Sequence, residues 1–239
     1  MAVVASRSVQ SLALMAQPKK PTGEIGMMRL SAGEGDASAE FMPIPFPTTK
    51  PDIEEYIVKR FLAQASGTQV FPYCGCAVEQ NPEADLDFTL TCADKKTRKL
   101  ELMELAPLEH LRGAYAEAPN SYNSYDFAKY IVGKIFAKSQ KYGRPSGSEL
   151  HLLVYITDWR FLVSDNTIAL VDWWLAHEPH NFTGIYLYEP IDQNTGLGIL
   201  LYPSSHKSKD FDPEAFRGNV VWNADPKGWK PVRGNGHES

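Results

Sequence analysis

The stretch "ADLDFTLTCADKKTRKLELMEL" (residues 84–105) contains two short segments in which apolar and polar residues alternate, separated by the charged turn "ADKK". Alternation with a period of two is typical of a β-strand that has one buried face. We therefore expect strands over residues 85–92 and 97–105 that pair as a hairpin. The positions of the charged residues on this hairpin are the main sequence evidence for a function.

The register of the hairpin follows from its apolar residues, because a slip by one residue would move an apolar set to the other face. The predicted register places Phe88 opposite Leu100 and, on the polar face, Asp87 opposite Glu101. Two carboxylates that face each other across strands repel, so a divalent cation, a shared proton or solvent must compensate. Mg²⁺ suits such a pair, since it combines one or two protein carboxylates with water and phosphate oxygens. Alternatively, this face is solvated and Lys99 neutralises both acids.

A helix is predicted on each side of the hairpin along the chain. The segment "FPTTKPDIEEYIVKRFLAQASG" (residues 46–67) has an apolar stripe, a capping residue at Thr48 or Thr49, and a terminal glycine. The segment "SYDFAKYIVGKIFAKSQKYG" (residues 124–143) starts at the potential cap Ser124 and also has one apolar face.

Two lysines of the second helix lie at unusual positions. On a helical wheel, Lys138 falls near the middle of the apolar face and Lys134 falls at its border. Ionised lysine is rare inside a packing face unless its ammonium reaches water, a phosphate or a carboxylate. Because this helix belongs beside the hairpin, either lysine can extend toward Asp87 and Glu101. The alternative is that both ammonium groups extend into solvent.

The remaining elements define the fold class. We expect a buried strand over residues 149–158, a helix over residues 164–181, and a second hairpin formed by residues 183–191 and 196–203. A strand, a long crossover helix and another strand predict a mixed β-sheet flanked by helices, in an α/β or α+β arrangement.

The 239 residues are enough for one domain with a substantial core. Residues 1–45 are rich in Ala, Ser, Gly and Pro, which predicts a disordered N-terminal extension. The α/β domain is expected over residues 46–204. Residues 205–239 form a polar C-terminal tail that docks in part, through apolar residues at 220–222.

The net charge of −5 gives no global reason to expect a nucleic-acid partner. A local basic patch around the hairpin turn could still approach nucleic acid, and its residues are Lys95, Lys96, Arg98 and Lys99. The alternative interpretation of this patch is an ordinary solvated turn. The alternative to a nucleic-acid partner is a protein partner.

Cysteine usage and hydropathy predict the cellular environment. The chain has three cysteines, Cys74, Cys76 and Cys92, which do not form the two close pairs of a zinc site. We expect reduced loop cysteines and a cytoplasmic protein. No apolar run approaches the ~20 residues of a membrane span, so no membrane association is expected.

An acid on each strand of a hairpin, with one helix before it and another after it, resembles the PD-(D/E)xK nuclease superfamily. The matching residues are Asp87 in "DLDFTL" and Glu101 in "LELMEL", and the resemblance covers roughly residues 50–160. It implies a restriction-endonuclease-like core in which these two acids hold divalent metal. A strand preceding Asp87, which this core requires, is difficult to find in the sequence. The family analogy also suggests Glu55 as an accessory acid, although a surface helix acid is the alternative.

The sequence departs from the family pattern at position 103, where Met103 replaces the lysine that positions or activates the attacking water. It is similar to a group of nuclease-like proteins that read "DF…LE-x-x-E", in which Glu104 matches the last acid. In these proteins the lysine comes from the next helix, which corresponds to Lys134 or Lys138 here.

The resemblance therefore predicts a metal-dependent nuclease that hydrolyses phosphodiester bonds with a two-carboxylate Mg²⁺ site. Asp87 and Glu101 are the expected metal ligands, and Lys134 and Lys138 complete the catalytic set. The alternative is a catalytically inactive nuclease-like fold that acts as a protein-binding module. Met103 and the acidic net charge favour this alternative.

Overall fold

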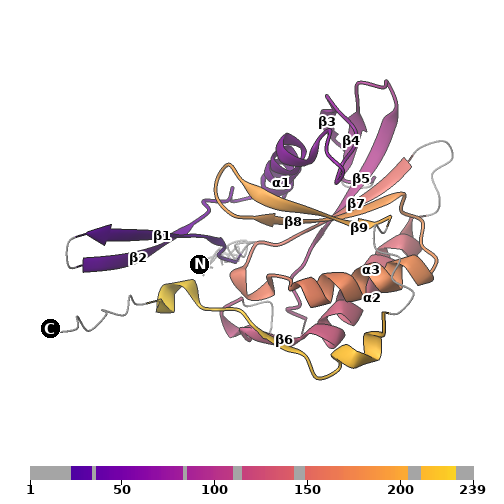
Figure 1. Ribbon diagram of the computed structural model, residues 1–239. Helices are drawn as coiled ribbons and strands as arrows, with labels where there is room; N and C mark the ends of the chain where they lie inside the picture. The colour runs from indigo at the N-terminus through magenta and orange to yellow at the C-terminus, as the bar shows by residue number, and fades with distance from the viewer. Residues whose placement is uncertain are drawn as a thin grey trace, which may run out of the picture.

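A six-stranded mixed β-sheet forms the centre of the protein, and helices cover both of its faces (Figure 1). The computed structural model describes residues 23–33, 36–82, 85–109, 115–142, 149–203 and 211–229. The prediction of a mixed sheet flanked by helices is confirmed.

The strands of this sheet are β3 (Ala77–Gln80), β4 (Phe88–Thr91), β5 (Thr97–Glu104), β7 (Glu149–Tyr155), β8 (Gly184–Pro190) and β9 (Gly196–Tyr202). They follow one another across the sheet in the order β3–β4–β5–β7–β8–β9. β7 pairs in parallel with both β5 and β8, and the other neighbours are antiparallel. The predicted register of the first hairpin is confirmed, because Phe88 pairs with Leu100.

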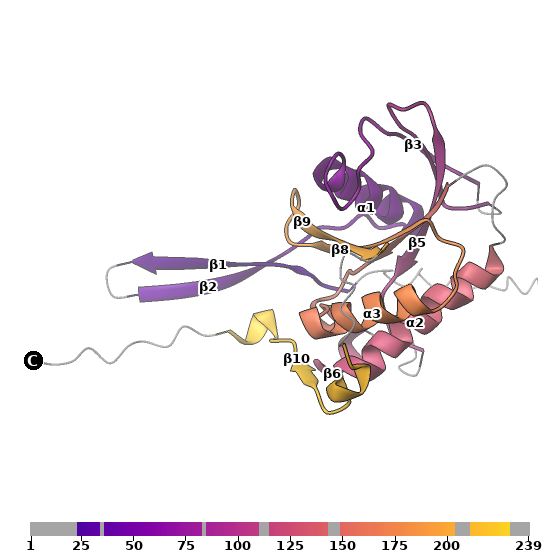
Figure 2. The ribbon, with the colours of Figure 1, turned by 45° about the vertical axis from the view of Figure 1, so that its right-hand side comes forward.

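Three α-helices pack on the sheet, namely α1 (Lys50–Ala65), α2 (Ser124–Lys141) and α3 (Asp165–His177). α1 covers one face, while α2 and α3 lie side by side on the other (Figures 1 and 2). Thr49 caps α1 by accepting a hydrogen bond from the backbone N–H of Asp52. The cap of α2 is Asn123 rather than the predicted Ser124, because the Asn123 side chain accepts bonds from the first backbone N–H groups.

Each face of the sheet has its own apolar core. On the α1 side, buried residues include Ile57, Phe61, Phe88, Leu100 and Tyr188. On the side of α2 and α3 they include Ile131, Ile135, Leu152, Leu170 and Ile185. The central strand β7 is covered on both faces, which explains its nearly continuous apolar sequence.

A hairpin of β1 (Gly26–Gly33) and β2 (Asp36–Pro43) projects from the body of the protein (Figures 1 and 2). Composition predicted a disordered segment here, so this part of the structure differs from the expectation. Backbone pairing along both strands holds the hairpin, and such pairing needs no particular side-chain composition. Residues 1–22, which belong to the same predicted extension, lie outside the described residues.

The C-terminal segment returns to the body through β10 (Val220–Trp222), which pairs antiparallel with β6 (Ser121–Asn123) just before α2. Short 3₁₀ helices complete the fold, at Tyr115–Glu117, Trp159–Phe161, Pro213–Phe216 and Pro226–Gly228. The parts of the predicted tail at 205–210 and 230–239 lie outside the described residues.

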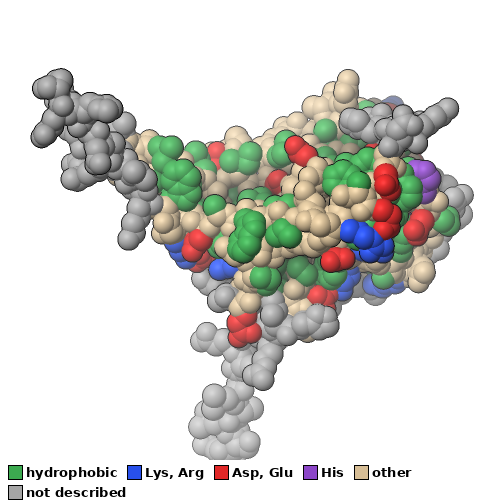
Figure 3. Space-filling model, turned by 60° about the horizontal axis from the view of Figure 1, so that its bottom comes forward, with side chains coloured by type: hydrophobic (Ala, Val, Ile, Leu, Met, Phe, Trp, Pro, Cys, Tyr) green, Lys and Arg blue, Asp and Glu red, His purple; other side chains and the backbone are tan. Residues whose placement is uncertain are grey.

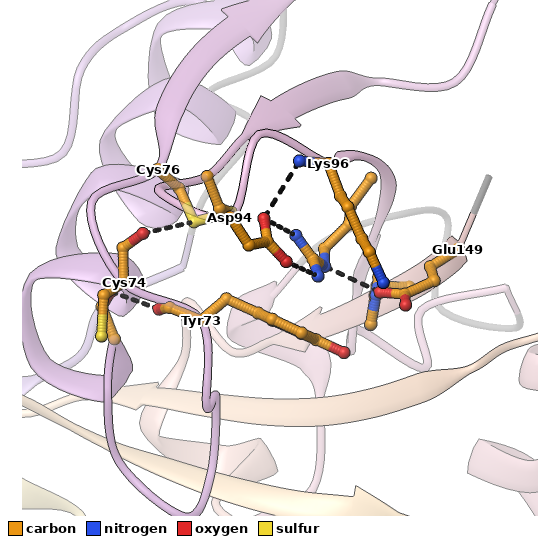
Figure 4. Close-up of a disulfide and its surroundings, with 10 residues drawn as sticks. Tyr73, Cys74, Cys76, Asp94, Lys96 and Glu149 are labelled. Carbon is orange, nitrogen blue, oxygen red and sulfur yellow. Dashed lines mark hydrogen bonds and ion pairs between the residues drawn. A yellow bond between two sulfur atoms is a disulfide. The ribbon is translucent and has the colours of Figure 1, made fainter.

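A disulfide joins Cys76 to Cys92 and links the edge strand β3 to the end of β4 (Figure 4). The expectation of reduced loop cysteines is therefore wrong for these two residues. The disulfide could not be predicted from the sequence, because the two residues are 16 positions apart and only the pairing of β3 with β4 brings them together. Cys74 is a free and exposed thiol.

Candidate functional site

Asp87 lies one residue before β4, where the backbone pairing between β4 and β5 ends. Its Oδ2 atom accepts a hydrogen bond of 2.7 Å from the backbone N–H of Leu102. The carboxylate thus takes the place of the next backbone acceptor along the ladder. This bond fixes the Asp87 side chain beside Glu101, the residue that precedes Leu102 on β5.

Glu101 lies on the face of β5 that packs against α2, and only 2% of the residue is exposed. The Lys138 ammonium forms an ion pair with Oε1, and the Tyr142 hydroxyl donates a 2.9 Å hydrogen bond to the same oxygen. The second oxygen, Oε2, is buried and has no hydrogen-bond partner among the described residues. An unsatisfied buried acceptor of this kind typically costs ~1–3 kcal/mol. The Oε2 atom therefore marks a position at which a cation or a donor would be stabilising.

Asp87 interacts electrostatically with two other carboxylates, Glu101 and Glu54. Burial raises the pKa of Asp87; the bond from Leu102 lowers it, and the Glu101 charge raises it again. The pKa of Glu54, on α1, is also raised, first by burial and then by the charge of Asp87. Asp87 is thus within electrostatic reach of an acid from the helix and an acid from the neighbouring strand. A bound cation would relieve this repulsion.

A cleft of about 550 Å³ lies between α1 and α2 over the last residues of β5. A second cleft of about 670 Å³ contains Asp87 and shares Lys50 and Glu54 with the first. Four lysines line the first cleft, namely Lys50, Lys134, Lys138 and Lys141. The site therefore combines acidic groups near the sheet with ammonium groups contributed by both helices.

Lys134 and Lys138 have different partners, although the sequence placed both near the paired acids. Lys138 binds Glu101, as described above. Lys134, one helical turn earlier on α2, lines the same cleft but forms its ion pair with Glu109. The structure therefore brings Asp87, Glu101 and Lys138 together and leaves Lys134 at the rim.

The basic residues of the β4–β5 turn have other partners. Arg98 is buried and bonded to Asp94 and Glu149, both of which Figure 4 labels. Lys99 donates to Thr89 at 2.9 Å and pairs with an acid other than Asp87 and Glu101. For Glu101, the neutralising role that the solvated interpretation gave to Lys99 thus belongs to Lys138. Of the predicted basic patch, Lys95 and Lys96 are the exposed members that no ion pair engages in the described structure.

Two further acids were singled out by the family analogy. Glu104 lines the cleft and accepts hydrogen bonds from Tyr115, at 2.7 Å, and from Thr157. Burial is the main reason that the pKa of Glu104 is raised. Glu55 pairs with Lys59 at 2.7 Å on the outer surface of α1, in agreement with its interpretation as a surface acid.

Sequence reasoning missed two residues that contribute to the site, Glu54 and Tyr142. Glu54 shares a buried stripe of α1 with Val58 and Leu62, and an acid within such a stripe is a signal that could have identified it. Tyr142 directly follows α2. Its hydroxyl reaches Glu101 because the end of α2 approaches β5, a distance that periodicity does not reveal.

The residues present suit a magnesium ion that shares its coordination with a ligand. The described residues contain no cluster of three or more His, Cys, Asp or Glu side chains arranged to hold a metal. Mg²⁺ does not require one, since water and phosphate oxygens commonly complete its octahedral shell. Asp87 and Glu101, with the unpartnered Oε2 atom, supply hard oxygen donors of the required kind.

No family model and no curated protein sequence matches this chain. In the part of the chain that the structure describes, no helix is both long enough and apolar enough to cross a membrane. The geometry and electrostatics of the site itself are therefore the basis for a function.

Proposed function

We propose that this protein is a metal-dependent nuclease that hydrolyses phosphodiester bonds, with Asp87 and Glu101 as the ligands of Mg²⁺. The observation that carries the proposal is the Oε2 atom of Glu101, which is buried without a hydrogen-bond partner in the described structure and lies beside a second carboxylate. A protein that used Glu101 only as the partner of Lys138 would gain nothing from burying this second oxygen unsatisfied.

The order of elements also supports the proposal. The chain runs from α1 through the antiparallel strands β3, β4 and β5 to α2 and then to β7, which lies parallel to β5. β3 pairs antiparallel with β4 at the edge of the sheet and is our candidate for the strand that the superfamily core requires before Asp87. It is only four residues long and lacks a regular apolar alternation. A restriction-endonuclease-like core is accordingly the finer fold assignment that we propose.

Each site residue has a role in the proposed reaction. When bound, the metal ion would lower the pKa of a water molecule and screen the charge of the phosphate. Asp87 and Glu101 hold that ion, and the Lys138 ammonium keeps Glu101 in place while adding positive charge on the cleft side. Hydrolysis adds water across one P–O bond, so one product carries the phosphate and the other a free hydroxyl.

A second candidate function is protein binding by a catalytically inactive nuclease-like fold. Large apolar side chains are exposed away from the cleft, with Leu30 on the projecting hairpin at 68% and Trp222 on β10 at 71% exposure. Apolar side chains also lie in separate groups on the face that Figure 3 shows. The two candidates are separated by whether the acids bind metal.

Calorimetric titration of Mg²⁺ and Mn²⁺ into the wild-type protein and Asp87→Asn tests the proposal. Asparagine retains an oxygen that can accept the hydrogen bond from Leu102, so this variant removes charge without removing the contact. The matched control is Asp85→Asn, which removes an exposed acid two residues away that pairs with Lys99. We expect metal heats in wild type and Asp85→Asn and their loss in Asp87→Asn. Equal heats in all three proteins would refute the metal site.

Cleavage of single- and double-stranded DNA and RNA by the same proteins then tests the nuclease activity itself.

A cytoplasmic location stays a prediction. The Cys76–Cys92 disulfide weighs against it, since disulfides persist mainly in oxidising compartments.

A further inference from the structure

Glu109 occupies a small anion-binding arrangement at the rim of the cleft between α1 and α2. Its carboxylate forms an ion pair with Lys134 and accepts hydrogen bonds from the Tyr130 hydroxyl at 2.9 and 3.1 Å. Lys134 lies over the ring of Tyr130, with its ammonium 5.3 Å from the ring centroid. The two donors, one helical turn apart on α2, thus converge on one carboxylate.

Three lysines of the cleft are each paired with a carboxylate of the protein, and the Glu109 pair differs from the other two in burial. The Glu101 and Glu54 side chains are 3% and 10% exposed, so neither can leave its lysine without stranding a buried charge. In the Lys134–Glu109 pair, both side chains are 44% exposed. Glu109 can therefore turn into water, and exposed pairs of this kind contribute little to stability.

Lys134 lies one helical turn from Lys138, the lysine that pairs with Glu101. Together with Tyr130, Lys138 and Lys141 it forms one stripe of α2 along the wall of the cleft. Lys134 is one turn, about 6 Å, from Lys138 along the helix axis. An anion bound at Lys134 and Tyr130 would thus lie in the same cleft as Lys138, the lysine that pairs with Glu101.

We propose that Lys134 and Tyr130 form a phosphate-binding subsite that Glu109 occupies as an internal competitor, and that a phosphate group of an incoming ligand displaces the Glu109 carboxylate. Inorganic phosphate or a phosphate monoester offers more acceptor oxygens and more charge than one carboxylate, and a phosphodiester matches the carboxylate with two acceptor oxygens and one charge, so both donors suit either group. The assignment to a nuclease substrate rests on the proposed function. The subsite itself requires no metal and no catalysis.

The test measures anion binding by the full chain in the presence of EDTA. The probes are a fluorescent single-stranded oligonucleotide and inorganic phosphate. Glu109→Gln removes the competing charge and keeps an acceptor for Tyr130, so we expect about a threefold to tenfold gain in oligonucleotide affinity. Glu55→Gln, which removes one charge from another exposed lysine pair, is the control for net charge and should give a smaller gain. Adding Lys134→Met to Glu109→Gln should abolish the gain.

Equal gains in Glu109→Gln and Glu55→Gln would overturn the subsite, as would a gain that survives Lys134→Met. If both probes gain, the subsite accepts any phosphate group; if only the oligonucleotide gains, it requires the nucleic-acid backbone, and either result supports the inference. Loss of metal heats in the experiment on Asp87 concerns the catalytic proposal alone. A metal-free gain at Glu109 thus remains interpretable if that proposal fails.

Discussion

Lys138 of α2 binds Oε1 of Glu101 across the interface between helix and sheet, and this contact neutralises a carboxylate that is otherwise almost completely buried. Removing one member of such a pair leaves the other charge buried and uncompensated.

Lys138→Met should therefore destabilise the protein by roughly 2–3 kcal/mol, somewhat below the cost for fully buried pairs because Lys138 is partly exposed. Methionine keeps most of the side-chain volume, so the loss reports charge rather than packing. Urea unfolding at neutral pH measures it. The control Lys59→Met removes an exposed partner of Glu55 and should cost less than about 1 kcal/mol. Similar small losses in both variants would contradict the structural role of the contact.

Asp87→Ala and Asp87→Asn should differ in stability. Alanine leaves the buried backbone N–H of Leu102 without its acceptor, which should cost about 1–2 kcal/mol. Asparagine keeps the acceptor and removes a carboxylate whose pKa is raised by burial and by Glu101. Since ionisation of such a group is unfavourable in the folded state, Asp87→Asn should equal or exceed wild type at neutral pH. Thermal unfolding of the three proteins decides the matter, and a similar loss in both variants would argue against the hydrogen bond.

Cys92→Ser should lower the free energy of unfolding by about 3 kcal/mol under oxidising conditions, because the disulfide closes a loop in the unfolded chain between residues 16 positions apart. Excess dithiothreitol should lower the stability of wild type by the same amount and leave Cys92→Ser unaffected. Cys74→Ser serves as the control, since this thiol is free. If dithiothreitol leaves the unfolding curve of the wild-type protein unchanged, the disulfide contributes nothing to the free energy of unfolding.

Glu189, on β8, should make stability depend on pH. Burial raises its pKa from 4.5 to about 7, despite the hydrogen bond that its Oε1 accepts from Val163. Between these two values the folded state binds more protons than the unfolded state, so stability falls as the pH rises through the interval. The penalty is complete above about pH 7 and amounts to at most ~3 kcal/mol.

Glu189→Gln keeps an acceptor for Val163 and removes this ionisation. Its stability relative to wild type should be greater at pH 8 than at pH 5, as measured by urea unfolding at both values. Glu178→Gln, an exposed acid at the end of α3, provides the comparison and should show the same difference at both pH values. A pH-independent effect of Glu189→Gln would refute the raised pKa.

The sequence predicted the long elements because their signals are local. The register of Phe88 against Leu100 followed from alternation together with the short length of the turn, and Thr49 could be proposed as a cap from the helix that it precedes. β3 escaped notice because a four-residue edge strand has too few residues for a pattern. Its existence depends on pairing with β4, which is a tertiary property.

The site was predictable to the extent that side-chain direction follows from periodicity. The face of Glu101 and the inward position of Lys138 came from periods of two and 3.6 residues. The choice between Lys134 and Lys138 did not, because it depends on which turn of α2 crosses β5. Glu109 follows β5 in a segment without periodicity, and its contact with Lys134 could be known only from the folded chain.

The projecting β1–β2 ribbon begins and ends at one point of the body. The backbone N–H of Ile44 bonds to the carbonyl of Ile25 at 2.8 Å, and both side chains are buried there. Splicing these two residues together, or grafting a foreign module between them, would accordingly leave the path of every central strand unchanged. The hairpin thus offers an attachment point for a reporter or an affinity handle that uses none of the residues lining the two clefts at the acids.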